Sequence, residues 1–374
     1  MTKKQSTDTV HLSALSLGAL TGVGIIALIL LISTSFFFSA KPVSFSRDAT
    51  SSPTSVVDTR PPKPVLDTVA YDKKMLSVAQ IATSSKYYEM YLNDDFGTST
   101  PPLWPVRAPY PKPGAILPFK RIVAYYGNFY SKGMGVLGEY PEAVMLDKLR
   151  AEVAAWEAAD PETPVVPAIH YIVETAQIAP GKQGLYLARM PDSQIDIALR
   201  LAEKVNGIVF IDFQVSLSTL EKELPMYEDY LKLPNVHLGI DPEFSMKTGV
   251  RPGKVIGSFD AADINYAINY LSRLVQENDL PPKVLVVHRF TYDMVTNTKR
   301  IKPTPEVQFV MDMDGWGGPE KKIGTYTHII VPEPVQFTGF KLFYKNDLFA
   351  PSSGMLTPKQ LLKLTPQPLY IQYQ

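Results

Sequence analysis

The 374-residue sequence contains no cysteine, only five histidines and no excess charge, with 37 basic and 37 acidic residues. Without cysteine, the chain forms no disulfide and no thiolate metal site, and it offers no cysteine for lipid attachment. A balanced charge argues against a nucleic-acid partner, because proteins that bind the phosphate backbone normally carry a basic surface. The sequence also lacks a GxxxxGK[ST] phosphate-binding loop.

Near the N-terminus, residues 13–40 carry no charged side chain over 28 positions. About 20 apolar residues suffice to cross a bilayer, and Lys3 and Lys4 just before the segment favour a cytoplasmic N-terminus. We therefore expect a cytoplasmic tail over 1–12 and a single-pass transmembrane anchor over 13–40, with the rest of the chain extracytoplasmic. A signal peptide cleaved after Ala40 is the alternative, and it leads to the same location for the remainder.

Two segments separate the expected anchor from the main domain. Residues 41–70 are rich in serine, threonine and proline, which is typical of an extended or disordered linker. Residues 71–119 are expected to form an N-terminal extension packed on the main domain. The remaining 255 residues, 120–374, are a usual length for one α/β barrel domain.

From residue 120 onward, apolar strand-like segments alternate with helix-like segments. Helices are expected after Ser193, after Ser218, which would form a capping box with Glu221, and after Asp260. Nearly continuous apolar strands predict parallel strands buried on both faces, so the fold class predicted is a (β/α)8 TIM barrel; a doubly wound open sheet is the alternative. The expected strands are 121–128, 165–174, 207–214, 236–244, 283–290, 307–313, 327–333 and 339–344.

Polar side chains follow or end most of these strands. In a TIM barrel the active site lies at the carboxyl ends of the strands, and residues two apart on a strand point to the same side of the sheet. Carboxyl groups crowded at the strand ends raise one another's pKa values and destabilise the fold, which a purely structural barrel has no reason to tolerate. The clustering of polar residues at the strand ends therefore predicts a functional site. In strand order the residues are Tyr126, His170, Asp212, Gln214, Asp241, Glu243, His288, Asp312, Asp314 and Glu333.

The Asp241-Pro242-Glu243 turn resembles the catalytic Asp-x-Glu of barrel glycoside hydrolases, both the Chalaropsis-type lysozymes and the chitinase-like family. This resemblance implies that Glu243 is the general acid and that Asp241 orients substrate or stabilises charge. The upstream segment 235–240 lacks the further aspartates of the chitinase-like DxxDxDxE motif. The Asp that the lysozymes carry at the end of strand one is replaced here by tyrosine and glycine. The whole sequence also resembles a group of membrane-anchored extracytoplasmic bacterial proteins, which implies no activity.

The resulting hypothesis is a hydrolase acting on a carbohydrate or cell-envelope polymer, with no cofactor and no metal. Glu243 would protonate the leaving glycosidic oxygen, and a second carboxylate, chosen among Asp212, Asp312 and Glu333, would support the transition state. Tyr126, His170, Gln214, His288 and Asp314 are expected to contact substrate. Trp316, just beyond the sixth strand, is placed to stack on a sugar ring.

Three other interpretations remain. A tethered barrel of this kind could bind glycan without cleaving it. A metal-dependent hydrolase could use zinc or manganese held by His170, His288, Asp212, Asp241 and Asp312, although the sequence lacks His-x-His on strand one and HExxH elsewhere. The GxGxxG formed by Gly133, Gly135 and Gly138 lies about five residues past the first strand, which predicts a substrate-contacting loop better than a dinucleotide site.

Overall fold

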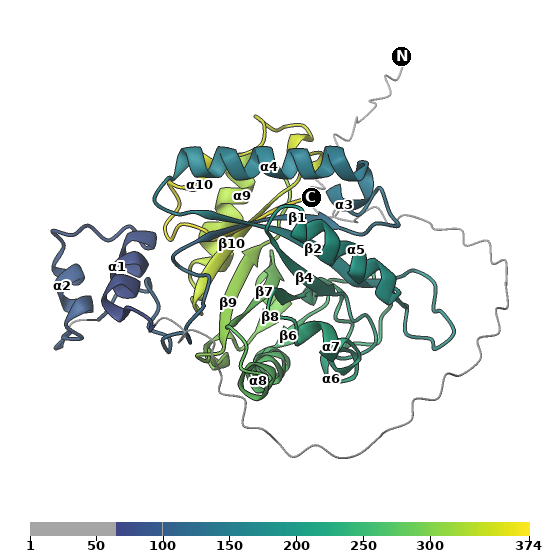
Figure 1. Cartoon of the computed structure of the whole chain (residues 1–374), viewed down its shortest axis with the longest axis horizontal. Helices are drawn as coiled ribbons and strands as arrows, with labels where there is room; N and C mark the ends of the chain where they lie inside the picture. Colours follow the sequence, from purple (N-terminus) through teal and green to yellow (C-terminus); the bar gives the residue numbers. More distant parts are fainter. Residues whose placement is uncertain (1–64, 99) are drawn as a thin grey trace, which may run out of the picture.

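The computed structural model describes residues 65–98 and 100–374 (Figure 1). The expected tail (1–12), anchor (13–40) and most of the expected linker (41–70) fall outside these residues, so those expectations stay predictions. Across 65–98 and 100–374, no helix is both long enough and apolar enough to cross a bilayer.

Eight parallel strands form a closed barrel. The hydrogen-bonded order is β1, β11, β10, β9, β7, β5, β4, β2, and β1 also pairs with β2, which closes the ring. The short strand β3 (Leu187–Arg189) adds to β2 in antiparallel fashion. The predicted TIM barrel is thus confirmed, and the open doubly wound sheet is wrong. The barrel strands are β1 (Arg121–Gly127), β2 (Val165–Ala176), β4 (Ile208–Phe213), β5 (Val236–Ile240), β7 (Lys283–Arg289), β9 (Val307–Met313), β10 (Phe337–Leu342) and β11 (Tyr370–Tyr373).

Successive side chains along each strand point alternately into the lumen of the barrel and outward toward the helices. On β7, for example, Val284 and Val286 belong to the core inside the barrel, whereas Leu285 and Val287 belong to the core between barrel and helices. Both faces are buried, which is why the strands are apolar almost throughout.

The longer helices lie outside the barrel, as Figure 1 shows for α4 (Glu142–Ala159), α5 (Asp192–Glu203) and α8 (Ala261–Glu277). Helix α8 begins as predicted, with Asp260 and Asp263 forming a capping box. The capping box expected at Ser218 is wrong, because Ser218 instead donates its hydroxyl to the Glu223 carboxylate. The shorter elements are α3 (Val136–Glu139), α6 (Leu220–Glu223), η1 (Leu224–Tyr227), α7 (Glu228–Leu231), η2 (Pro242–Phe244), β6 (Phe259–Asp260), η3 (Tyr292–Met294), β8 (Val295–Thr296), η4 (Thr298–Arg300), α9 (Pro319–Thr325), η5 (Tyr326–Ile330), η6 (Asn346–Leu348) and α10 (Pro358–Leu361).

The strand predicted over 327–333 is wrong, and the eighth strand is β11 instead. Three consecutive β-branched residues at 329–331 favour a strand locally. However, Pro319 opens helix α9, which continues into the π-helix η5. Tyr326 and Ile330, four residues apart, are both fully buried, so tertiary packing follows the helical period rather than the alternating one.

The N-terminal extension closes the amino-terminal end of the barrel. Helix α1 (Thr68–Val78) contributes Tyr71, Met75 and Val78 to the apolar core that fills the amino-terminal half of the lumen. Helix α2 (Lys86–Leu92) follows α1 in the chain. Residues 100–119 form no helix or strand. This arm is held by Gln308 of β9, whose side-chain oxygen accepts from the Ile116 backbone N–H at 2.8 Å.

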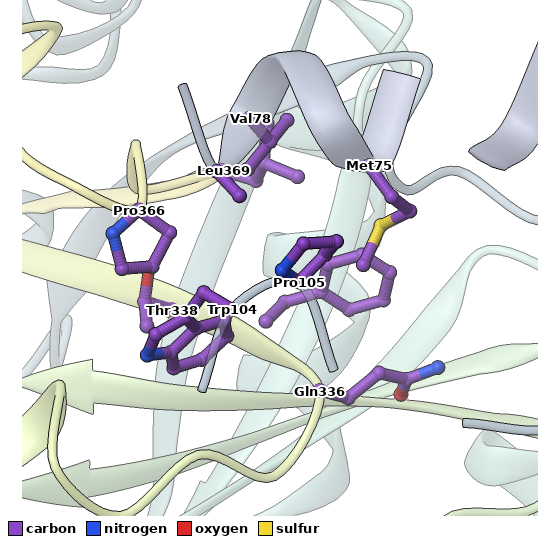
Figure 2. Close-up of a pocket in the computed structure, with 10 residues that line it drawn as sticks. Met75, Val78, Trp104, Pro105, Gln336, Thr338, Pro366 and Leu369 are labelled. Atoms are coloured by element: carbon purple, nitrogen blue, oxygen red, sulfur yellow. The ribbon is translucent and has the colours of Figure 1, made fainter. Parts of the chain in front are cut away.

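A cavity of about 10 Å³ lies between this extension and the barrel, lined by Met75, Trp104, Phe337 and Leu369 among others (Figure 2). It has room for about one water molecule and none for a sugar. It lies at the amino ends of β10 and β11, whereas the polar residues predicted to be functional follow the carboxyl ends.

Candidate active site

A layer of polar side chains fills the carboxyl half of the lumen, and every barrel strand contributes to it. Beneath it lie Phe210, Val286 and Val310 of the apolar lumen core. The side chains of the layer are almost completely buried. Its members are Tyr126 of β1, His170 of β2, Asp212 of β4, Asp241 after β5, His288 of β7, Asp312 of β9 with Asp314 just beyond it, Lys341 of β10, and Tyr370 and Gln372 of β11.

Asp212 lies at the centre of this layer. Its Oδ2 accepts a hydrogen bond from the Tyr126 hydroxyl at 2.9 Å. Its Oδ1 lies 3.2 Å from His170 Nε2 and 3.3 Å from His288 Nε2. The other nitrogen of His170, Nδ1, lies 2.6 Å from the Tyr370 hydroxyl. Three side chains predicted to be functional on three separate strands therefore meet around one aspartate.

His288 connects this centre to the aspartates at the end of β9. Its Nδ1 lies 3.3 Å from Asp312 Oδ2 and 3.2 Å from Asp314 Oδ2. Although burial opposes the charged form, Asp212 and the two β9 carboxylates raise the pKa of His288 well above its usual value. Asp314 also forms an ion pair with Lys341 at 2.9 Å, and the Lys341 ammonium lies 4.0 Å from the centre of the Tyr126 ring.

The Asp-Pro-Glu turn begins in this layer with Asp241 and continues past the carboxyl end of β5. Strand β5 ends at Ile240, and Pro242 begins the 3-10 turn η2. Asp241 caps the turn by accepting the Glu243 N–H at 3.0 Å, and Gly257 N–H donates to the Glu243 carbonyl at 2.6 Å. The second bond holds the returning end of the 244–259 loop against the turn.

The two carboxyl groups of this turn have strongly shifted pKa values. Burial, with further contributions from Asp314 and Asp212, raises the pKa of Asp241 to about 7. Burial and the neighbouring Asp241 raise the pKa of Glu243 to about 8. Glu243 is partly exposed, whereas Asp241 is buried. Glu243 therefore carries a carboxyl group that is largely protonated at neutral pH.

Three predicted site residues lie outside the polar layer. Gln214 uses its side-chain oxygen to accept the Ala176 N–H at 3.1 Å, which fixes the end of β2. Trp316 lies on the loop after β9, edge-on to Phe349 with ring centres 6.1 Å apart. Glu333 does not end a strand. It follows η5 and pairs at 2.5 Å with Arg289 Nη2, so it is removed from the candidate second carboxylates.

Sequence reasoning missed three members of the polar layer: Lys341, Tyr370 and Gln372. A lysine alternating with Phe340 and Leu342 in an apolar strand was a usable signal, because a lysine on the buried face of a strand normally has a carboxylate partner. Tyr370 and Gln372 carried no comparable signal. Their strand has only four residues and directly follows a segment interrupted by Pro366 and Pro368.

A second buried acidic pair lies away from the central layer. Glu174 of β2 lies 3.7 Å from Arg189 Nε, and the same arginine pairs with Glu223 at 2.7 Å. Burial and the nearby Glu223 raise the pKa of Glu174 to about 10. The Glu174 carboxyl group is thus protonated in the folded chain at neutral and moderately basic pH.

This pair supports a prediction about stability. Between its unfolded pKa and its folded pKa, Glu174 binds more protons in the folded chain than in the unfolded one, so it lowers stability as the pH rises through that window. We expect Glu174→Gln to become progressively more stable than the wild type between pH 5 and pH 9, by at most about 1.4 kcal/mol per pH unit. Urea unfolding of both proteins at several pH values measures the difference. Glu157→Gln, at an exposed position, should show the same dependence of unfolding free energy on pH as the wild type. If Glu174→Gln also shows the wild-type dependence, the raised pKa of Glu174 is wrong.

Comparison with known proteins adds no family assignment. No family model matches the chain, and no curated protein matches it. Among solved structures, the chain is similar to a ruminal endo-β-1,4-mannanase, with 12% identity, 68% of this chain and 59% of that chain covered, and a TM-score of 0.32. It is also similar to a Bacillus subtilis mannanase, with 11% identity over 69% of this chain and 80% of that chain and a TM-score of 0.36.

A third similar structure is a sugar phosphate isomerase/epimerase from Parabacteroides distasonis, with 10% identity, 72% and 90% coverage, and a TM-score of 0.31. The chain spans 59% of the length of the ruminal mannanase. With TM-scores this low, the likeness carries no argument about function, and the argument for an activity depends on the residues in the lumen of this barrel.

Proposed function

We propose that the barrel hydrolyses glycosidic bonds with Glu243 as the general acid. The observation that carries the proposal is the carboxyl group of Glu243, which follows Asp241 just past the carboxyl end of β5 and whose pKa burial and Asp241 raise to about 8. General acids work best with a pKa near the working pH, and glycosidases raise the pKa of a carboxyl group for this purpose. The decisive test is whether the full chain releases reducing ends from polysaccharides and loses that activity in Glu243→Gln.

A glycosidase needs a second carboxylate that stays ionised, and Asp314 suits this role best. It lies just past the end of β9 and pairs with Lys341 at 2.9 Å, which holds it as a carboxylate. Asp212 and Asp312, the candidates from the sequence, are completely buried below the mouth. We assign them to positioning His170 and His288 rather than to direct contact with the sugar.

Aromatic side chains surround the mouth on the loops that follow the barrel strands. Tyr130 follows β1, Tyr292 follows β7 and Phe349 follows β10, with exposed fractions of 55%, 50% and 53%. Trp316, packed beside Phe349, extends this rim after β9. Flat aromatic faces with polar edges suit contact with sugar rings. Their spread around the rim favours an extended carbohydrate polymer as substrate.

The location belongs to the proposal as well. The uncharged segment 13–40 would anchor the chain in the membrane, and residues 41–64 would tether the barrel on the outer side, within reach of a cell-envelope polymer. This part of the proposal depends on the sequence alone.

The proposed acid predicts a pH limit. Activity requires protonated Glu243, so the rate should fall as the pH rises through about 8. The charged and titratable groups that act on Glu243 are Asp241, Asp314, Lys341 and His288. The measurement is kcat/KM against pH between 5 and 10 on a soluble polysaccharide substrate, with circular dichroism at each pH to verify folding. A rate that keeps rising to pH 10 would exclude Glu243 as the acid.

A further inference from the structure

We propose that His170, Asp212 and His288 form a binding site for one divalent transition-metal ion, zinc by its donor set, in the lumen beneath the Asp-Pro-Glu turn. One ligand atom from each residue lies within 4.8 Å of the other two, and all three side chains are completely buried. The site is a separate inference from the hydrolase activity, because its ligands are not the proposed acid Glu243 or the carboxylate Asp314, and its occupancy can be measured without any substrate.

The distances fit a shared ion better than direct hydrogen bonds. Asp212 Oδ1 lies 3.2 Å from His170 Nε2 and 3.3 Å from His288 Nε2, and none of these three atoms has a hydrogen-bond partner of acceptable geometry. Charge-assisted N–H···O bonds normally span about 2.7–2.9 Å. Tetrahedral zinc with bonds of about 2.0–2.1 Å holds its ligand atoms about 3.3–3.4 Å apart. Buried polar atoms left without partners are uncommon, and here three of them face one another.

Other side chains lie next to the outer atoms of the three ligands. The Tyr370 hydroxyl lies 2.6 Å from His170 Nδ1, and the Tyr126 hydroxyl donates to Asp212 Oδ2. Asp312 and Asp314 lie 3.3 and 3.2 Å from Nδ1 of His288. Metal-bound histidines usually donate their second N–H to a carboxylate or another acceptor, which fixes the ring orientation. Each imidazole therefore points Nε2 toward Asp212. The Nδ1 of His170 has a hydrogen-bond partner in Tyr370, whereas the Nδ1 of His288 has two carboxylates near it without hydrogen-bond geometry.

The backbone leaves room at this point through Gly239 of β5. A Cβ at that position would lie 2.2 Å from Asp212 Oδ1 and 2.4 Å from His170 Nε2. Gly239 has no unusual φ angle. The lack of a side chain, rather than backbone conformation, is therefore what this position requires, because it leaves space beside the ligand atoms.

The donor atoms suit a transition-metal cation. Asp212 Oδ1 lies between Nε2 of His170 and Nε2 of His288. Two imidazoles and one carboxylate form a donor set of the kind that binds zinc, with a fourth position left for water.

The site can be tested on the full chain solubilised in detergent. After removal of metal with a chelator and dialysis against Zn²⁺, elemental analysis should find about one zinc per chain. Loading with Co²⁺ should give the visible absorption of a tetrahedral nitrogen- and oxygen-ligated ion. His170→Gln and His288→Gln should each lose at least tenfold in bound metal. His328→Gln, which removes an exposed imidazole, should keep the wild-type content.

Zinc content equal to the wild type in both ligand variants would overturn the proposal, because the metal would then lie elsewhere. Folded wild-type chain that takes up no metal would overturn it as well. Should the ligand variants fail to fold, the wild type alone decides. A tetrahedral Co²⁺ spectrum together with a rise in Tm on adding Zn²⁺ supports the site, and an octahedral spectrum or an unchanged Tm overturns it. Loss of activity in Glu243→Gln bears on none of these outcomes.

Discussion

Glu243→Gln should lower kcat/KM for polysaccharide hydrolysis by about 10²- to 10⁴-fold, the usual contribution of a general acid. Glutamine keeps the size of the side chain and can still hydrogen-bond, but it has no acidic proton to give to the leaving oxygen. The turn itself should survive, because the bonds that hold it use the Glu243 backbone N–H and carbonyl rather than the carboxyl group. The measurement is reducing-end release from a panel of soluble polysaccharides.

Two controls make this result interpretable. Glu157→Gln makes the same chemical change at an exposed position on α4 and should retain wild-type kinetics. Binding of the best substrate to Glu243→Gln, measured by calorimetry, should stay within a few-fold of the wild type. If the wild type binds glycan and cleaves none of the panel, the alternative of a non-catalytic glycan-binding barrel gains support. If Glu243→Gln cleaves as fast as the wild type, the general-acid assignment is wrong.

Lys341→Met should destabilise the barrel by about 3–5 kcal/mol, the usual cost of removing one partner of a buried ion pair. Lys341 and Asp314 are only 4% and 8% exposed in their side chains, and methionine keeps most of the volume of lysine without its charge. Asp314 would then lose its lysine partner and keep only His288 Nδ1, at 3.2 Å, among the carboxyl groups of Asp312 and Asp241. Urea unfolding followed by circular dichroism measures the loss.

A matched control lies four residues along the chain. Lys345 pairs with Glu139 at 2.7 Å, but its side chain is 64% exposed, so Lys345→Met should cost less than about 1 kcal/mol. Adding Asp314→Asn to Lys341→Met should recover part of the lost stability, because it removes the uncompensated charge. Equal effects of Lys341→Met and Lys345→Met would show that the lumen pair is not desolvated as the structure implies.

The strand-end pattern predicted most of the polar layer. Tyr126, Asp212, His288 and Asp312 each lie one residue before the end of a barrel strand, whereas His170 lies in the middle of the longer strand β2. A parallel strand buried on both faces has few polar positions, and most of these fall near its carboxyl end. Glu243 reached the mouth by another route. Its strand ends three residues earlier, and the 3-10 turn capped by Asp241 places it.

The errors have a common origin in local sequence that tertiary packing overrides. A run of β-branched residues predicted a strand over 327–333, and with it a site role for Glu333, yet the segment is helical and Glu333 pairs with Arg289. Gln214 directly follows β4, and its side-chain oxygen accepts from the Ala176 N–H of β2. Four residues at the end of the chain were too short a segment to predict as β11.

The sequence by itself determined that buried parallel strands alternate with helices and that acidic and imidazole groups stand at the strand ends, because apolar periodicity and polar interruptions are local properties. Only the tertiary structure decided which of these groups meet. Barrel closure brings β1 beside β11, so that His170 contacts Tyr370, two hundred residues away in the chain. The same closure places Asp212 between two imidazoles and Glu243 in a buried environment beside Asp241. Burial and proximity, which no local pattern encodes, set the opposite protonation states of these two carboxyl groups.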